Sequence, residues 1–169
     1  MTDNFIQLNK SDVLTLAIRT DDGIETGEYL VFDLEDIELP LRYQELMEKD
    51  KKNRENLRNQ MLIIDKRQDI KGKKLLTKNE EDKIKLIKEF FEKEVEVYNM
   101  FLGDNGVQKL LNGRKLGWTS LDMIDDIIEK QIKPHLNLKA EDFVEKVKER
   151  YSKAKERNNN ILKEDGANE

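Results

Sequence analysis

The chain has 169 residues, a formal net charge of −5 and no cysteine. Charged residues make up 40% of it and hydrophobic residues 37%, which favours one highly helical domain with a modest core, or a protein that completes its burial against a partner. The lack of cysteine excludes disulfides, thiol catalysis and thiolate metal sites. Charges of both signs are mixed along the chain, so the overall charge does not favour a nucleic-acid partner.

The beginning of the chain is polar, and we expect a flexible N-terminus over residues 1–12. This stretch lacks the basic start and the apolar run of a signal peptide, and no apolar run in the chain has membrane-spanning length. We therefore expect a cytoplasmic protein with no membrane partner.

A β-hairpin is predicted over residues 13–34. Hydrophobic residues alternate over 13–20, the Asp21-Asp22-Gly23 sequence is a strong turn signal, and a second β-type run follows at 28–32. A hairpin alone is marginal in water, so it must dock on helices or pair with another chain. Eight acidic residues and no basic ones lie between Asp21 and Glu38. They form either an ordinary solvated surface or a docking surface for a basic partner.

Helices are predicted over residues 40–157, beginning with a long charged helix. Pro40 suits the first turn of this helix, and its fully polar centre at 48–56 is expected to stand clear of the core. A basic loop follows at 65–78. The Thr77-x-x-Glu80 capping box then begins a central helix that Gly103 is placed to end.

The central helix is the most apolar element of the chain. One helical stripe is predicted to face the core, and it contains Ile84, Ile87, Phe91, Val95, Tyr98 and Leu102. Phe90, Val97 and Phe101 widen this face beyond what one stripe needs. A helix of this kind has to be covered by other elements.

The remaining helices are shorter. We expect a short helix at 107–111. A second helix is capped by Thr119 or Ser120 and ends before Pro134, and Asn137 could cap a last helix. Residues 158–169 have the composition of a disordered tail. The predicted fold class is α+β, mainly α, in a single domain over 13–157: an N-terminal β-hairpin followed by a bundle of four to five helices.

Few residues suggest chemistry. The carboxylates of Asp122, Asp125, Asp126 and Glu129 recur at helical spacing and could hold Mg²⁺, as paired acidic helices do in all-helical nucleotide pyrophosphatases. The plainer interpretation is the polar face of an amphipathic helix. His135 is the only histidine and has no cysteine or second histidine to join it. We expect no catalytic residue, no metal site and no cofactor.

Three stretches share one layout: residues 32–46 with Arg42 and Tyr43 at a helix start, residues 89–115 with a Phe-Leu-Gly turn and a short helix, and residues 120–132. This layout resembles the tail-assembly chaperones of long-tailed, siphovirus-type phages and of prophages in Gram-positive bacteria. The resemblance covers roughly residues 28–135. The strand and turn at 13–27 and the length of the charged helix depart from the family pattern.

The resemblance implies a non-enzymatic protein of the host cytoplasm. Such chaperones bind the long helical tape-measure protein, keep its apolar stripes from aggregating, and leave as tail tube subunits assemble. The tape-measure protein, the tail tube protein and further copies of the chain are the partners it implies. Phe90, Val97, Phe101 and Trp118 are our candidates for the binding groove, because they lie off the main stripe or beside its end. An adaptor or inhibitor that docks through the acidic hairpin is the alternative, and a Mg²⁺-dependent all-helical nucleotide pyrophosphatase is a further alternative.

Overall fold

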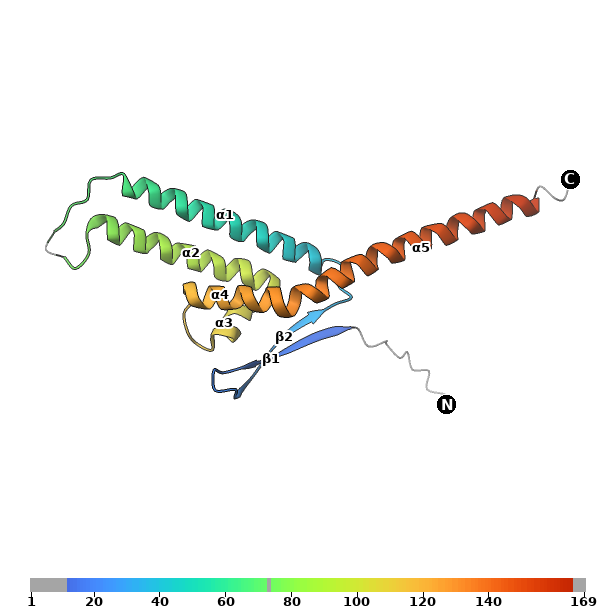
Figure 1. Ribbon diagram of the computed structural model, residues 1–169, viewed down its shortest axis with the longest axis horizontal. Helices are drawn as coiled ribbons and strands as arrows, with labels where there is room; N and C mark the ends of the chain where they lie inside the picture. The colour runs from blue at the N-terminus through green and yellow to red at the C-terminus, as the bar shows by residue number, and fades with distance from the viewer. Residues whose placement is uncertain (1–11, 73, 166–169) are drawn as a thin grey trace, which may run out of the picture.

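The chain folds into a two-stranded antiparallel hairpin followed by helices (Figure 1). The computed structural model describes residues 12–72 and 74–165, and the side chains of these residues up to 155. The fold class, α+β and mainly α, is confirmed. Most of the segment predicted to be a flexible N-terminus, residues 1–11, lies outside the described residues.

Strand β1 (Val13–Arg19) pairs with strand β2 (Glu25–Asp33), and Leu16 lies opposite Leu30 in the register. The predicted hairpin is therefore present, although its second strand begins three residues earlier than expected. Alternation places Leu30 and Phe32 on the buried face, where Phe32 packs against Phe101 with ring centroids 5.6 Å apart. The hairpin is thus held by the helices, as an isolated hairpin must be.

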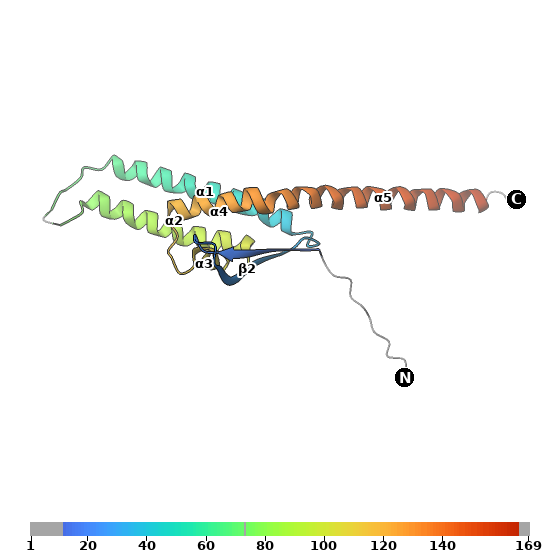
Figure 2. The same cartoon turned by 60° about the horizontal axis from the view of Figure 1, so that its bottom comes forward.

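Two long helices, α1 (Leu39–Asp65) and α2 (Lys78–Leu102), lie side by side and antiparallel (Figures 1 and 2). The prediction that segment 48–56 stands clear of the core is wrong. Asp50 is buried, and Asn53 donates a hydrogen bond of 2.7 Å to Glu94 of α2. Polar side chains are buried here because they bond to one another across the two helices.

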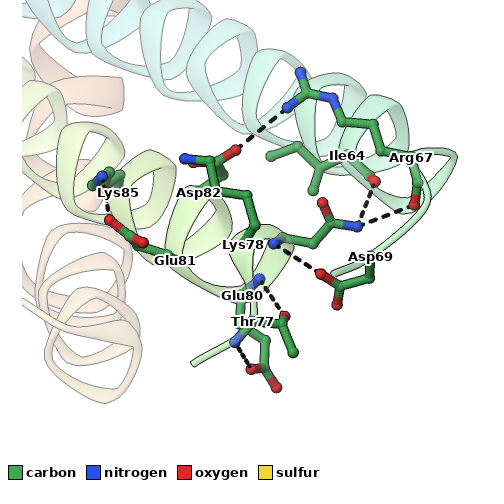
Figure 3. Close-up of polar contacts among 10 residues, drawn as sticks. Ile64, Arg67, Asp69, Thr77, Lys78, Glu80, Glu81, Asp82 and Lys85 are labelled. Atoms are coloured by element: carbon green, nitrogen blue, oxygen red, sulfur yellow. Dashed lines mark hydrogen bonds and ion pairs between the residues drawn. The ribbon is translucent and has the colours of Figure 1, made fainter. Parts of the chain in front are cut away.

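The connection between α1 and α2 is tied at both ends (Figure 3). The predicted capping box is present, because the Thr77 hydroxyl accepts from the Glu80 amide while the Glu80 carboxylate accepts from the Thr77 amide. The side-chain amide of Asn79 donates to the carbonyls of Arg67 and Ile64 at 3.1 and 3.4 Å. These bonds fix the far end of the helix pair without any third helix beside it.

After α2 the chain turns sharply at Gly103, where the helix ends as predicted. The expected left-handed cap is not formed, because φ is +89° but ψ is 179°, a backbone conformation open to glycine. Helix α3 (Gly106–Leu111) follows where a short helix was predicted. Helix α4 (Trp118–Ile127) begins earlier than predicted. Its cap is Gly117, whose amide donates to the Ser120 hydroxyl at 2.9 Å.

The predicted helix end before Pro134 is wrong. Helix α4 continues through a π-helical turn, η1 (Ile128–Ile132), into α5 (Lys133–Asp165). The Lys133 amide donates to the carbonyl of Ile128, five residues back, so the helix widens just before the proline. This widened turn accommodates a residue that lacks an N–H and would crowd the preceding turn of a regular helix.

Helix α5 leaves the body of the molecule and projects as a single rod (Figures 1 and 2). It continues to Asp165, so the disordered tail predicted from residue 158 is helical over 158–165. None of the helices in the described ranges combines the length and the apolar character needed to cross a bilayer.

The core lies where β2, the second half of α2, α3 and α4 meet. Phe90 and Phe101 are buried in it, whereas Ile84, placed on the core stripe by its spacing, is 52% exposed. The difference arises because α4 begins beside Phe90 and leaves the first half of α2 uncovered (Figure 1). This uncovered half is where the candidate site lies.

Candidate helix-binding groove

A surface hollow of about 450 Å³ runs between the distal halves of α1 and α2, and we name it the distal groove. Its lining residues come from α1, α2 and the first residue of α4: Arg54, Leu57, Arg58, Met61, Leu62, Ile87 and Trp118. The apolar lining side chains of α1 follow helical spacing, which sets them along one face. Leu62 is 50% exposed, so an apolar surface is left open to solvent.

Trp118 closes one end of the distal groove. Its ring stacks on Phe90, with centroids 5.3 Å apart and planes 28° from parallel, and meets Phe91 edge-on at 4.8 Å. The indole is nevertheless 47% exposed. A large aromatic side chain that is held on one face and open on the other is typical of an interface anchor.

A second hollow, of about 730 Å³, lies on the other side of Trp118 between the tip of the hairpin, α3 and the start of α4. Ile18, Leu111 and Met123 contribute apolar surface to it, and Arg114 and Lys115 contribute positive charge. Among the lining residues of the two hollows, Trp118 is the one that they share, and it lies between them.

The structure separates the four residues predicted to form the groove. Phe90 and Phe101 are 4% and 3% exposed, and Val97 is half-buried against the same core. In this fold these three side chains pack in or against the core and do not line the distal groove. Only Trp118 lies at an open surface. Its partners there, among them Met61, Leu62 and Ile87, were not predicted, although Leu57 and Met61 carried a signal as apolar positions on the far half of α1.

A polar cluster fastens α4 between α1 and α2 beneath the groove. Arg54 of α1 binds Asp50 at 2.6 Å and reaches Asp125 of α4 at 3.1 Å. The Tyr98 hydroxyl of α2 donates to the other oxygen of Asp125. Burial, and then this hydrogen bond, raise the pKa of Tyr98, which keeps the hydroxyl protonated and able to donate.

Glu94 is the most deeply buried member of the same region, with no exposed surface. One carboxylate oxygen accepts from Asn53, and the other has no hydrogen-bond partner among the described residues. Burial, together with the nearby Asp50 carboxylate, raises the pKa of Glu94 to about 7. The carboxyl therefore titrates near neutrality, and its charged form lowers the stability of the fold.

The charge of the groove follows from two arginines one helical turn apart. Arg54 is paired with Asp125 of α4. Arg58 also lines the groove, and no carboxylate of the described residues forms an ion pair with it. The site therefore offers an apolar floor with one available positive charge.

Three of the four carboxylates predicted as a possible Mg²⁺ stripe bind other side chains of the chain, among them Asp126, which pairs with Lys130 at 2.5 Å. Asp125 binds Arg54 and Tyr98, and Glu129 accepts from Tyr43 and Lys133, each at 2.6 Å. Across the described ranges, no group of three or more acidic, histidine or cysteine side chains is placed to hold a metal ion. This geometry gives no structural support to the nucleotide pyrophosphatase alternative.

The acidic hairpin is partly neutralised by bases of the same chain. Glu28 lies 3.9 Å from Lys109, and Asp21 lies 3.3 Å from Arg114. At its other end Glu35 binds Lys139 at 3.2 Å. These pairs hold the hairpin against the helices, and they reduce the negative charge that a basic partner would meet.

No protein-family model, curated protein or solved structure matches this chain. The site must therefore be interpreted from its own geometry. An exposed apolar channel between two helices, with an aromatic anchor at one end, is suited to binding a protein helix.

Proposed function

We propose that this protein is a non-enzymatic assembly chaperone that holds an amphipathic helix of its client in the distal groove. The observation that carries the proposal is the course of α4. This helix packs between α1 and α2 only as far as Trp118, and beyond that residue the same interhelical channel continues without a third helix (Figure 1). A client helix placed end to end with α4 would complete a three-helix arrangement.

The packing of α4 indicates what such a client needs. Leu121 and Ile124 of α4 are fully buried, and the neighbouring Asp125 meets Arg54. One turn farther along α1, Arg58 is placed to meet a carboxylate in the same way. The client is therefore a helix with an apolar stripe and an acidic residue beside it.

The resemblance to phage tail-assembly chaperones supplies the identity of the client. In that family the client is the tape-measure protein, whose long helices expose apolar stripes before the tail tube forms around them. Covering one such stripe would limit its self-association. An apolar channel that is open in the free protein fits this role.

The sole tryptophan of the chain makes the proposal directly testable. The probe is a set of overlapping purified helical segments of the tape-measure protein encoded in the same phage or prophage genome. Binding in the distal groove covers the indole of Trp118, so its emission should shift to shorter wavelength and saturate. A matched pair of variants, Leu62→Asp and Ile63→Asp, locates the site. The Leu62 side chain is 50% exposed and lines the groove, whereas the Ile63 side chain is 56% exposed and lies outside it.

Leu62→Asp should weaken binding at least ~10-fold, whereas Ile63→Asp should leave it close to wild type. Equal effects of the two variants would contradict the groove assignment. If no tape-measure segment bound, the proposed identity of the client would be wrong. If the protein instead bound a basic protein, and neutralising the acidic residues of the hairpin abolished that binding, the adaptor alternative would be favoured.

A further inference from the structure

The connection between α1 and α2 is strongly basic in an acidic chain. Residues 66–78 contain six basic residues and one acidic residue, whereas the whole chain has a net charge of −5. The connection forms the end of the molecule opposite the projecting helix α5 (Figures 1 and 2). Positive charge is therefore concentrated at one extremity of the protein.

The carboxylates near this connection are bound within the chain. Asp69 accepts from the backbone amide of Asn79 at 3.2 Å, and Glu80 accepts from the backbone amide of Thr77 at 2.7 Å (Figure 3). The other three nearby acidic residues form ion pairs: Asp65 with Lys83, Glu81 with Lys85, and Asp82 with both Arg67 and Lys78. These carboxylates are therefore engaged by groups other than the remaining lysines of the connection.

Three lysines and two aliphatic side chains of the connection are left open to solvent. Lys66, Lys71 and Lys74 are exposed, and none of them forms an ion pair with a carboxylate of the described residues. Ile70 is 73% exposed and Leu75 is 98% exposed. Side chains this exposed contribute little to the core. We name these five residues the basic tip.

The composition of the basic tip favours an anionic lipid surface over other anionic partners. Lysines are attracted to such a surface, and aliphatic side chains enter the boundary between headgroups and acyl chains. A nucleic acid would neutralise the lysines but would give the aliphatic side chains no apolar environment, and the basic tip has no aromatic residue that could stack on bases. An acidic protein fits less well, because a projecting tip of few residues buries little area against it.

We propose that the basic tip docks on the surface of a bilayer that contains anionic lipids, with Ile70 and Leu75 in the headgroup region and the three lysines beside lipid phosphates. Such a contact needs no spanning helix. It replaces the expectation of no membrane partner, which considered only signal peptides and spanning segments. The lining of the distal groove includes no residue of the basic tip, so this inference does not depend on the proposed function.

Co-sedimentation of the full-length chain with vesicles tests the contact. We expect binding to vesicles of phosphatidylcholine mixed with phosphatidylglycerol, little binding to phosphatidylcholine alone, and weaker binding in high salt. Reversing two charges of the basic tip, with Lys71→Glu and Lys74→Glu together, should weaken binding at least ~10-fold. The matched control reverses Lys148 and Lys153, two exposed lysines of α5, and should bind like wild type.

A second pair of variants tests the aliphatic part of the contact. Leu75→Ser should weaken binding ~10-fold, because it removes an apolar side chain and leaves every charge in place. Leu138→Ser is the control, since Leu138 is 68% exposed on α5. The natural chain has no cysteine, so single cysteines can carry an environment-sensitive fluorophore. On anionic vesicles the emission should shift to shorter wavelength for the label on Leu75→Cys and stay unchanged for the label on Leu138→Cys.

Three results would overturn the proposal. Lack of binding to anionic vesicles at lipid concentrations up to the millimolar range would exclude it, as would vesicle binding that neither tip variant weakens. Equal binding to duplex DNA and to vesicles, with no effect of Leu75→Ser on either, would indicate a general polyanion site. The substituted side chains of the basic tip are exposed and lie outside the core, so the variants should keep the thermal stability of wild type, and loss of binding cannot then be attributed to unfolding.

Discussion

Arg54 and Asp125 lie 71 residues apart in the chain and 3.1 Å apart in space, and their ion pair joins α1 to α4. Asp125 also accepts from the buried Tyr98 hydroxyl of α2, so one carboxylate connects all three helices. Arg54 also lines the distal groove, together with Trp118 at the first residue of α4. The end of α4 is therefore held by polar bonds as well as by apolar packing.

Replacing Asp125 should loosen α4. Asp125→Ala leaves the Tyr98 hydroxyl buried without its acceptor and removes one of the two carboxylates bound by Arg54. We expect the free energy of unfolding to fall by about 1–3 kcal/mol, measured by urea denaturation. Asp122→Ala makes the same change at an exposed position three residues earlier on α4 and should alter stability by less than about 0.5 kcal/mol. If both variants lost the same free energy of unfolding, the loss would come from removing a negative charge from α4 and not from breaking this contact.

The carboxyl of Glu94 should make stability depend on pH. Its pKa is raised from 4.5 to about 7 in the folded protein, so between these values the folded state binds the extra proton. The contribution of Glu94 to the free energy of unfolding therefore falls as pH rises through this window. Glu94→Gln removes the charge, keeps an acceptor for Asn53 and adds a donor beside Asp50.

The gain from Glu94→Gln should consequently be larger at high pH, by about 2 kcal/mol between pH 5 and pH 8. Denaturation at the two pH values measures it. Glu96→Gln, an exposed change two residues later on α2, should leave the pH dependence of the wild type intact. A Glu94→Gln variant that is less stable than wild type at pH 8 would show that the buried charge is compensated.

Local sequence patterns predicted the elements whose causes are local. The capping box at Thr77 and Glu80, the stop at Gly103 and the hairpin turn each depend on residues within a few positions. The polar cluster could not be predicted in this way. Periodicity assigns Asn53 and Glu94 to solvated faces, because nothing near either residue reveals that they are hydrogen-bond partners 41 residues apart.

The candidate site was harder to predict for a related reason. The sequence marks Phe90 and Phe101 as surplus apolar residues, but whether a surplus residue is buried depends on where α4 begins along α2. The π-helical turn before Pro134 likewise turns an expected helix end into a continuous rod. Trp118 lines the distal groove, and its exposure became evident only from the three-dimensional arrangement.

Arg58 should determine the charge preference of the distal groove. If a client carboxylate meets this side chain, Arg58→Glu should weaken binding of an acid-flanked helix about 10-fold or more, and the loss should shrink in high salt. The measurement is titration of Trp118 fluorescence with the tape-measure segments described above. Arg114→Glu, which changes a basic residue of the other hollow, is the control and should have little effect. If only Arg114→Glu weakened binding, the client would bind in the hollow between the hairpin, α3 and α4.

Gly106 should be essential at the corner between α2 and α3. A Cβ added there would lie 2.5 Å from the Cβ of Leu102, an atom that cannot move without shifting the end of α2. Gly106→Ala should therefore lower the free energy of unfolding by about 1–3 kcal/mol. Gly72→Ala is the matched control, because nothing lies within 4 Å of its Cβ position, and it should be neutral or slightly stabilising. Thermal denaturation compares the two variants. If Gly106→Ala were as stable as Gly72→Ala, α3 would not pack closely on Leu102, and this corner would not support the core.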